Sequence, residues 1–215
     1  MEQIIQISIY IHAFFGGIAL LSGLGSMIFQ KGSKNHKKAG KIFSYSLVVS
    51  SLISLPIAWM PNHENMFLFL IGIFTIYLVL SGNRILLFKK KKQANFTDKL
   101  ISGLLFLSAS LMLLFGSYYL VKGNDIAVLF LFFGAIALVF SIRDFLFFKA
   151  IDKKKILPLH IGKITGAYIA SVTAFLVAGI KFLGLIYWIA PTIIGTIFIV
   201  HWIRKVTRKK EQVLS

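Results

Sequence analysis

The stretch SIRDFLFFKAIDKKKILPLHIGKITGAYIASVTAFLVAG, at residues 141–179, decides the fold. It ends one apolar run, passes through a cluster of lysines, and becomes apolar again. Because a helix needs about 20 apolar residues to cross the hydrocarbon core, this pattern predicts two membrane-spanning helices joined by a basic turn. After the turn, small residues recur at every fourth position: Gly162, Gly166, Ala170, Ala174 and Ala178. Such a stripe lets another helix approach closely in lipid, so we place this helix at the centre of a bundle.

The composition supports a membrane protein. Hydrophobic residues make up 57% of the chain and charged residues 14%, which is too apolar for a soluble domain of this length. The absence of cysteine excludes disulfides, thiolate metal sites, iron–sulfur clusters and cysteine nucleophiles. The first residues, MEQIIQ, lack the positive charge that begins a signal peptide, so we expect the first apolar run to be a mature helix.

The whole chain is predicted to be all-α, a polytopic membrane protein with a single domain over residues 1–215. Lipid satisfies no backbone hydrogen bonds, so each apolar stretch is expected to form a helix. We expect kinks at Pro56 and Pro191, which lie inside such stretches. The seven predicted transmembrane helices, packed in one bundle, cover residues 4–30, 40–60, 65–88, 98–121, 125–148, 159–180 and 182–205.

The basic residues predict the orientation. All of the 24 lysines and arginines except Lys122 and Lys181 lie in the turns after the first, third and fifth predicted helices, in the tail after the seventh, or in the helix ends next to them. The positive-inside rule therefore places the N-terminus outside and the C-terminus in the cytoplasm. The net charge of +17 then reflects topology and contact with anionic lipids, and we expect no binding of nucleic acid.

Three of the four arginines, Arg84, Arg143 and Arg204, lie at the predicted cytoplasmic ends of the third, fifth and seventh helices. One interpretation is a ring of guanidinium groups that grips a phosphate, a carboxylate or a haem propionate. The alternative is snorkelling, in which each long side chain reaches the headgroups from within the helix.

Two carboxylates and an amide lie near the same ends. Asp144 follows Arg143, and Asn83 precedes Arg84. An unpaired carboxylate at this depth is costly, so we expect Asp144 to face the bundle and to pair with an arginine of a neighbouring helix, with proton carriage as the alternative. Asp98 is predicted to cap the fourth helix.

The five histidines divide by predicted depth. His36, His160 and His201 lie near the cytoplasmic interface, His12 lies in the outer half of the first helix, and His63 lies in an outer loop. The inner three suit a zinc site completed by Asp98 or Asp144. His36 and His160 suit axial ligation of haem b, with Arg84 and Arg143 on the propionates. No metal-binding spacing is present, and interfacial imidazoles bonded to backbone and headgroups are the third interpretation.

Two other chemistries fit poorly. A retinal Schiff base needs a lysine inside the seventh helix, and residues 182–203 contain none. A serine hydrolase of the nucleophile-elbow type needs a GxSxG-like sequence, which the chain lacks.

Four stretches resemble a known family. They are HAFFGGIAL at residues 12–20, HKKAGK at 36–41, HIGKITGAYIA at 160–170 and WIAPTIIG at 188–195. Together they resemble the prokaryotic membrane proteins called domain of unknown function 2306. The resemblance implies a multi-pass protein of the bacterial cytoplasmic (inner) membrane and draws attention to His12, His36 and His160, but it implies no activity, substrate or cofactor.

We therefore expect an integral membrane protein with a polar site near the cytoplasmic leaflet, formed by His36, Arg84, Arg143, Asp144 and His160. Three functions remain as alternatives. The chain is a haem- or metal-binding redox protein, a carrier for a small anion or proton-coupled solute, or an accessory subunit. The expected partners are the lipid bilayer, including anionic lipids, and either a second copy of the chain or another membrane protein.

Overall fold

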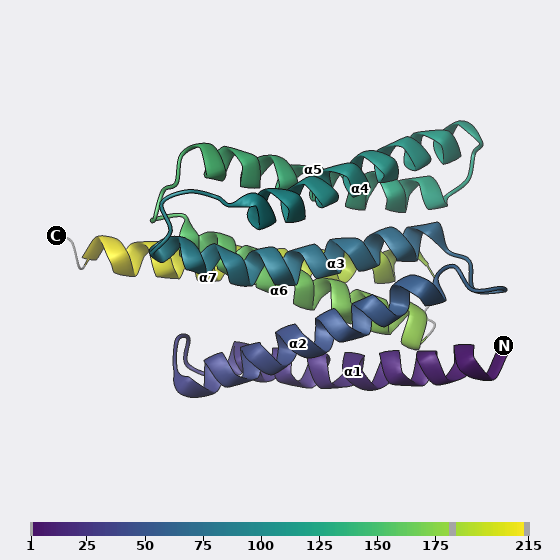
Figure 1. Cartoon of the computed structure of the whole chain (residues 1–215), viewed down its shortest axis with the longest axis horizontal. Helices are drawn as coiled ribbons and strands as arrows, with labels where there is room; N and C mark the ends of the chain where they lie inside the picture. The colour runs from purple at the N-terminus through teal and green to yellow at the C-terminus, as the bar shows by residue number, and fades with distance from the viewer. Residues whose placement is uncertain (1, 181–183, 213–215) are drawn as a thin grey trace. The chain divides into compact units, whose positions relative to one another are not determined.

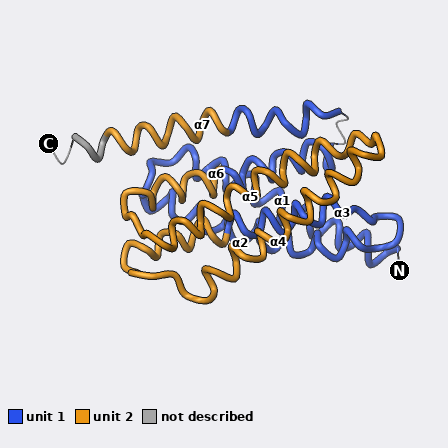
Figure 2. Tube along the Cα trace, turned by 90° about the horizontal axis from the view of Figure 1, so that it is seen from above, with its two compact units in different colours: residues 1–79, 166–195 blue, residues 80–165, 196–215 orange. Residues whose placement is uncertain are grey.

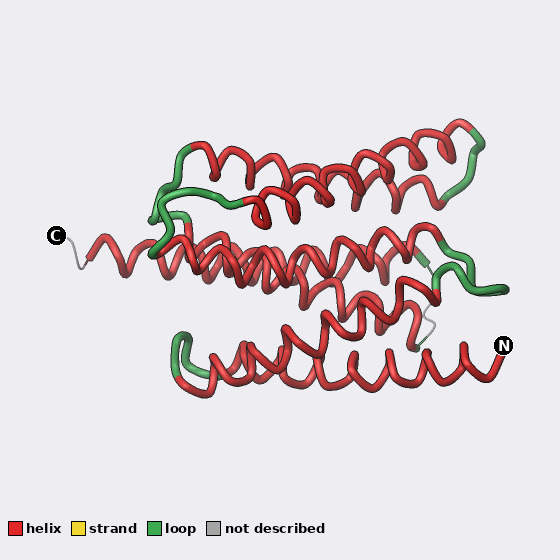
Figure 3. The backbone as a smooth tube through the Cα atoms, in the orientation of Figure 1, coloured by secondary structure: helices red, strands yellow, loops and turns green. Residues whose placement is uncertain are grey.

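The computed structural model describes residues 2–180 and 184–212 and is helical throughout, with no strand in the part described. The helices are α1 (Glu2–Ile28), α2 (Lys34–Ile57), α3 (Met66–Arg84), α4 (Phe96–Val121), α5 (Ile126–Lys149), α6 (Ile156–Ala174) and α7 (Leu185–Gln212) (Figure 1). A 3-10 turn, Ile85–Lys89, extends α3, and a π-helical turn, Phe175–Gly179, extends α6. Short loops join the helices (Figure 3).

All seven helices in the described ranges are long and apolar enough to cross a membrane. The prediction of an all-α protein with seven candidate membrane spans is thus confirmed, and the fold is that of a multi-pass membrane protein. Each helix overlaps one predicted stretch. Of the residues used to predict the orientation, Lys181 lies outside the described residues.

The ends of the helices follow local capping chemistry. The side chain of Ser33 caps α2 by accepting a hydrogen bond of 3.1 Å from the backbone N–H of His36. Pro56, which we expected to kink the second helix, lies one residue before the end of α2. Because proline donates no backbone hydrogen bond and its ring crowds the carbonyl four residues earlier, α2 ends one residue after it instead of continuing with a kink. Pro191 lies inside α7 as predicted.

The chain forms two compact units (Figure 2). The first comprises residues 1–79 and 166–195, and the second comprises residues 80–165 and 196–215. Thus α1 and α2 belong to the first unit and α4 and α5 to the second, whereas α3, α6 and α7 each contribute to both.

In the first unit, α1 packs along α2 (Figure 1). Gly23 allows this unit to close tightly, because a Cβ atom at that position would lie 2.6 Å from Cδ2 of Tyr168 and 2.9 Å from Cδ2 of Phe43. The rings of Phe43 and Tyr168 themselves contact each other, with centroids 6.1 Å apart. The first unit is thus held by aromatic packing against a glycine.

In the second unit, α4 packs along α5 (Figure 1). A buried apolar cluster of Ile85, Phe88, Phe147 and Ile156 closes the end of this unit where α3 ends and α6 begins. The rings of Phe88 and Phe147 meet edge to face at 5.3 Å. This cluster fixes the ends of α3, α5 and α6 next to the site described below.

Two glycines of the predicted stripe of small residues, Gly162 and Gly166, do not make close contacts. In the described part of the chain, no atom lies within 4 Å of a Cβ built at Gly162, and Gly166 has only ordinary contacts at 3.7 Å with Leu78. The close approach uses Gly82 of α3, where a Cβ would lie 2.9 Å from Cδ1 of Ile164 and 3.0 Å from Cβ of Lys163. The glycine that lets α6 approach in this unit is therefore on its neighbour.

Replacement of Gly116 by alanine should destabilise the second unit. A Cβ there would lie 2.8 Å from the side chain of Leu131 and 3.1 Å from its backbone nitrogen, and the backbone cannot yield without moving α5. We expect Gly116→Ala to cost about 1–3 kcal/mol of stability, measured as thermal unfolding in detergent. The matched control is Gly103→Ala in the same helix, where no described atom lies within 4 Å of the added Cβ. Equal melting temperatures for the two variants would contradict this packing.

Candidate functional site

Two opposite charges are buried against each other in the second unit. Nζ of Lys163, on α6, lies 2.5 Å from Oδ1 of Asp144, on α5. The side chain of Lys163 is 1% exposed and that of Asp144 is 0% exposed. Both residues lie within helices that are long and apolar enough to cross a membrane. The pair is thus enclosed by protein within two candidate membrane spans.

Serine hydroxyls from two further helices complete the hydrogen bonding of the carboxylate. Ser102 of α4 donates to Oδ2 of Asp144 at 2.8 Å, and Ser81 of α3 donates to the same oxygen at 3.1 Å. The ammonium group of Lys163 also donates to the hydroxyl of Ser81. Ser141 of α5 donates to the backbone carbonyl of Ser102 at 2.9 Å. We call these five residues the ion-pair cluster; they come from α3, α4, α5 and α6.

The energetics of the ion-pair cluster differ from those of a surface salt bridge. Removing two charges from water costs several kcal/mol for each ion, and mutual attraction offsets this only when other hydrogen bonds satisfy the remaining lone pairs and protons. The serines supply those bonds. Even so, well-packed apolar residues in place of such a pair are often as stable or more stable. Stability alone therefore does not explain the pair, and ionisable groups at membrane depth usually serve a function.

A second charged group lies at the start of α4. Asp98 receives hydrogen bonds from Nε of Arg84 and Nζ of Lys91, each at 2.8 Å. Its carboxylate also accepts from the backbone of Asn95, whose side chain in turn accepts from the backbone of Asp98, each at 3.1 Å. This is a capping box, so the N-cap is Asn95 and Asp98 is the third residue of the helix. The prediction that Asp98 itself caps the helix was wrong by one turn.

A small cavity lies between Ser81 and the charged residues Arg84 and Asp98. It is lined by polar groups of Ser81, Arg84 and Asp98 and by the apolar side chains of Ile85, Phe88, Ile101 and Phe148. Its volume, about 10 Å³ for the centre of a water molecule, is that of roughly one water. Ser81 belongs to the ion-pair cluster, whereas Arg84 and Asp98 belong to the capping group. One water in the cavity would therefore lie between Ser81 of the ion-pair cluster and the charged end of α4.

Three histidines donate a hydrogen bond to a backbone carbonyl within their own unit. Nδ1 of His160 lies 2.7 Å from the carbonyl oxygen of Gly82, Nδ1 of His36 lies 2.8 Å from that of Ser26, and Nδ1 of His12 lies 2.9 Å from that of Ser50. A carbonyl oxygen only accepts, so the proton is on Nδ1 in each ring. In the neutral form, Nε2 of each histidine is then the atom that can accept a proton or bind a metal.

The predicted metal ligands are not assembled. Within residues 2–180 and 184–212, no three histidine, aspartate or glutamate side chains come together as a metal site. Asp144 is bonded to Lys163 and two serines, His201 is exposed beside Trp202, and His36 and His160 belong to different units. Axial ligation of haem by His36 and His160 together stays a prediction.

The other predicted polar residues are dispersed. Arg143 and Asn83 are exposed, as is Arg204, whereas Arg84 is partly buried against Asp98. The salt-bridge partner of Asp144 is Lys163, so the prediction of an arginine partner was wrong. The exposed positions of Arg143 and Arg204 favour snorkelling over a ring of guanidinium groups.

Lys163 is the residue that sequence reasoning missed, because we counted it with the basic residues around the turn after the fifth predicted helix. The structure places it seven residues inside α6, and Asp144 lies five residues before the end of α5. At 1.5 Å per residue, both are about 8–10 Å from the shared turn. Two opposite charges at equal depth on consecutive helices are the signal that could have found the pair.

Comparisons of the chain with protein-family models, with curated proteins and with solved structures gave no match. The assignment of chemistry to this site therefore depends on its geometry.

Removal of either charge should destabilise the protein more than removal of both. Lys163→Met or Asp144→Asn leaves one ionisable group buried without its partner, and keeping it charged or neutralising it costs about 3–5 kcal/mol, whereas the double variant leaves no such group. We expect the double variant to have a higher melting temperature in detergent than either single variant. Arg143→Gln, which removes an exposed charge next to Asp144, is the control and should melt with the wild type. Additive losses would mean that the two charges do not compensate each other.

Proposed function

We propose that this chain is a proton-coupled carrier for a small anion in the bacterial cytoplasmic membrane, with its N-terminus outside and its C-terminus in the cytoplasm. The basic residues at one side of the helices support the orientation. The observation that carries the proposal is the fully buried pair of Asp144 and Lys163, held between helices of membrane-spanning length. Membership of the family that the sequence resembles is part of the same proposal.

Charge balance explains how such a pair couples a proton to an anion. In the structure, the carboxylate of Asp144 is the counter-ion of the Lys163 ammonium group. When Asp144 takes up a proton, it becomes neutral and leaves one uncompensated positive charge in a medium of low dielectric constant. An anion that enters at that moment restores neutrality. Binding of the proton therefore favours binding of the anion, and loss of the proton favours its release, because Asp144 then competes for Lys163.

The serines suit this exchange. Ser81 and Ser102 donate to Oδ2 of Asp144 in the state described. Hydroxyl groups rotate, so the same two donors can bond to an anion that replaces the carboxylate beside Lys163. A small anion with several acceptor oxygens, or a halide, matches one ammonium and two hydroxyl donors. The ion-pair cluster thus contains the donors that such a ligand needs.

A route for the proton and the anion is suggested by the neighbouring charged group. The small cavity beside Ser81 is lined by Arg84 and Asp98, and Asp98 also contacts Lys91. Lys91 follows the 3-10 turn at the basic end of α3. We propose that ions reach the ion-pair cluster from this end, the cytoplasmic one in the proposed orientation. Both Arg84 and Lys91 attract anions toward the cavity.

Proteoliposomes test the coupling directly. Vesicles that contain a pH-sensitive dye, clamped at zero membrane potential, receive external nitrate, phosphate or chloride in turn. With wild-type protein, at least one anion should acidify the interior faster than in protein-free vesicles. Lys163→Met should lose both acidification and anion uptake, because it lacks the anion-binding charge. Asp144→Asn should lose acidification but retain anion uptake, because residue 144 is then no proton site and the entering anion itself serves as the counter-ion of Lys163.

Two controls make the result specific. Arg143→Gln removes an exposed charge beside Asp144 and should transport as the wild type does. Each variant is assayed below its own melting temperature, so that loss of transport is not loss of fold. Equal rates with and without protein across the three anions, or identical behaviour of Asp144→Asn and Lys163→Met, would refute the proposed coupling.

A further inference from the structure

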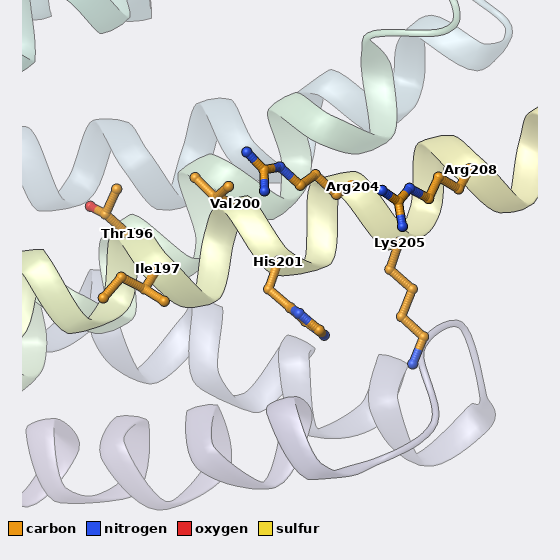
Figure 4. Close-up of a pocket in the computed structure, with 7 residues that line it drawn as sticks. All are labelled: Thr196, Ile197, Val200, His201, Arg204, Lys205 and Arg208. Atoms are coloured by element: carbon orange, nitrogen blue, oxygen red, sulfur yellow. The ribbon is translucent and has the colours of Figure 1, made fainter.

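One face of α7 is exposed over three turns and changes in chemistry along its length. A hollow of about 1010 Å³ runs along this face and is lined mainly by Ile197, Val200, His201, Arg204, Lys205 and Arg208 (Figure 4). The spacing of these residues is that of one helical face. All of them are exposed, and no residue from 185 to 208 is buried.

The face has an apolar part, then a histidine, then a basic part. Residues 185–208 contain no aspartate or glutamate. In Figure 4 the guanidinium groups of Arg204 and Arg208 reach back along the helix, on the same row as Val200, whereas His201 and Lys205 point to the other side. Nζ of Lys205 lies 4.9 Å from the ring centre of Trp202. An apolar stretch that ends in tryptophan and basic residues is typical of a helix that meets the membrane–water interface.

We propose that this face binds an anionic phospholipid, with its phosphate on Arg204 and Arg208 and an acyl chain along Ile197 and Val200. Guanidinium groups bind phosphate oxygens through two parallel hydrogen bonds, which suits them better than lysine for this task. Their reach toward the apolar part places the phosphate where a headgroup joins its acyl chains. The site is independent of the transport proposed above.

The combination of apolar and basic side chains on this face favours a lipid over a free phosphate or a second copy of the chain. A free phosphate would use the arginines but would leave Ile197 and Val200, which are 67% and 41% exposed, without an apolar partner. A second copy of this face would bring like charges together, because it carries three basic side chains and no acidic one. An anionic lipid matches both halves.

Native mass spectrometry of the full chain in detergent tests the site. The probes are phosphatidylglycerol and phosphatidylcholine with the same acyl chains, and inorganic phosphate as a competitor. We expect wild-type protein to retain phosphatidylglycerol in preference to phosphatidylcholine. Arg204→Gln/Arg208→Gln should bind it about 30-fold more weakly, since each basic residue near an anionic headgroup contributes roughly a factor of five.

Matched variants distinguish binding at this face from general attraction between an anionic lipid and a basic protein. Lys153→Gln/Lys154→Gln removes two exposed charges from the turn after α5 and should retain the lipid as the wild type does. Arg204→Lys/Arg208→Lys preserves the charge and should bind at an intermediate level, which keeps the test open if the glutamine variant does not fold. Equal weakening by the two glutamine pairs, displacement of the lipid by equimolar phosphate, or a lipid-free dimer that covers the face would each overturn the proposal.

Discussion

A hydrocarbon environment offers no water to a polar group, and this constraint governs the structure. Backbone groups satisfy it by forming helices, which explains why the described chain is helical wherever it is apolar. Charged side chains satisfy it only by pairing within the protein. Asp144 and Lys163 do so at 2.5 Å, with serines of α3 and α4 bonded to the carboxylate. The ion-pair cluster therefore satisfies the requirement for charge pairing in hydrocarbon, and it is also the site to which we assign the proposed function.

The position of the pair depends on close packing as much as on charge. Gly82 lets α6 approach α3 so that Lys163 reaches Ser81, and the same residue supplies the carbonyl that accepts from His160. The apolar cluster of Phe88 and Phe147 fixes the nearby helix ends. The polar centre is thus held by close packing, which suits the proposed exchange of the Asp144 carboxylate for an anion beside Lys163.

The sequence predicts the helices well because hydropathy and charge placement act locally, and all seven are present in the described residues. It also predicts that Asp144 needs a buried cation. It does not identify Lys163, because the rule that assigns lysines to cytoplasmic turns applies equally to a lysine two turns inside a helix. The partners of His12, His36 and His160 are backbone carbonyls, which carry no signal in the sequence. Gly162 and Gly166 of α6 suggested tight packing that, in the second unit, Gly82 of α3 provides instead, since periodicity does not reveal which of two helices carries the close contact.

The ionisation state of Asp144 in a bilayer tests the central claim most directly. Solid-state NMR of protein labelled with ¹³C at the aspartate carboxyl groups, reconstituted at neutral pH, distinguishes a carboxylate from a carboxylic acid, and Asp144→Asn assigns the signal. The account predicts an ionised Asp144 in the wild type that becomes a neutral acid in Lys163→Met, because a lone charge would be too costly there. An Asp144 signal that is neutral in the wild type, or unchanged by Lys163→Met, would contradict it.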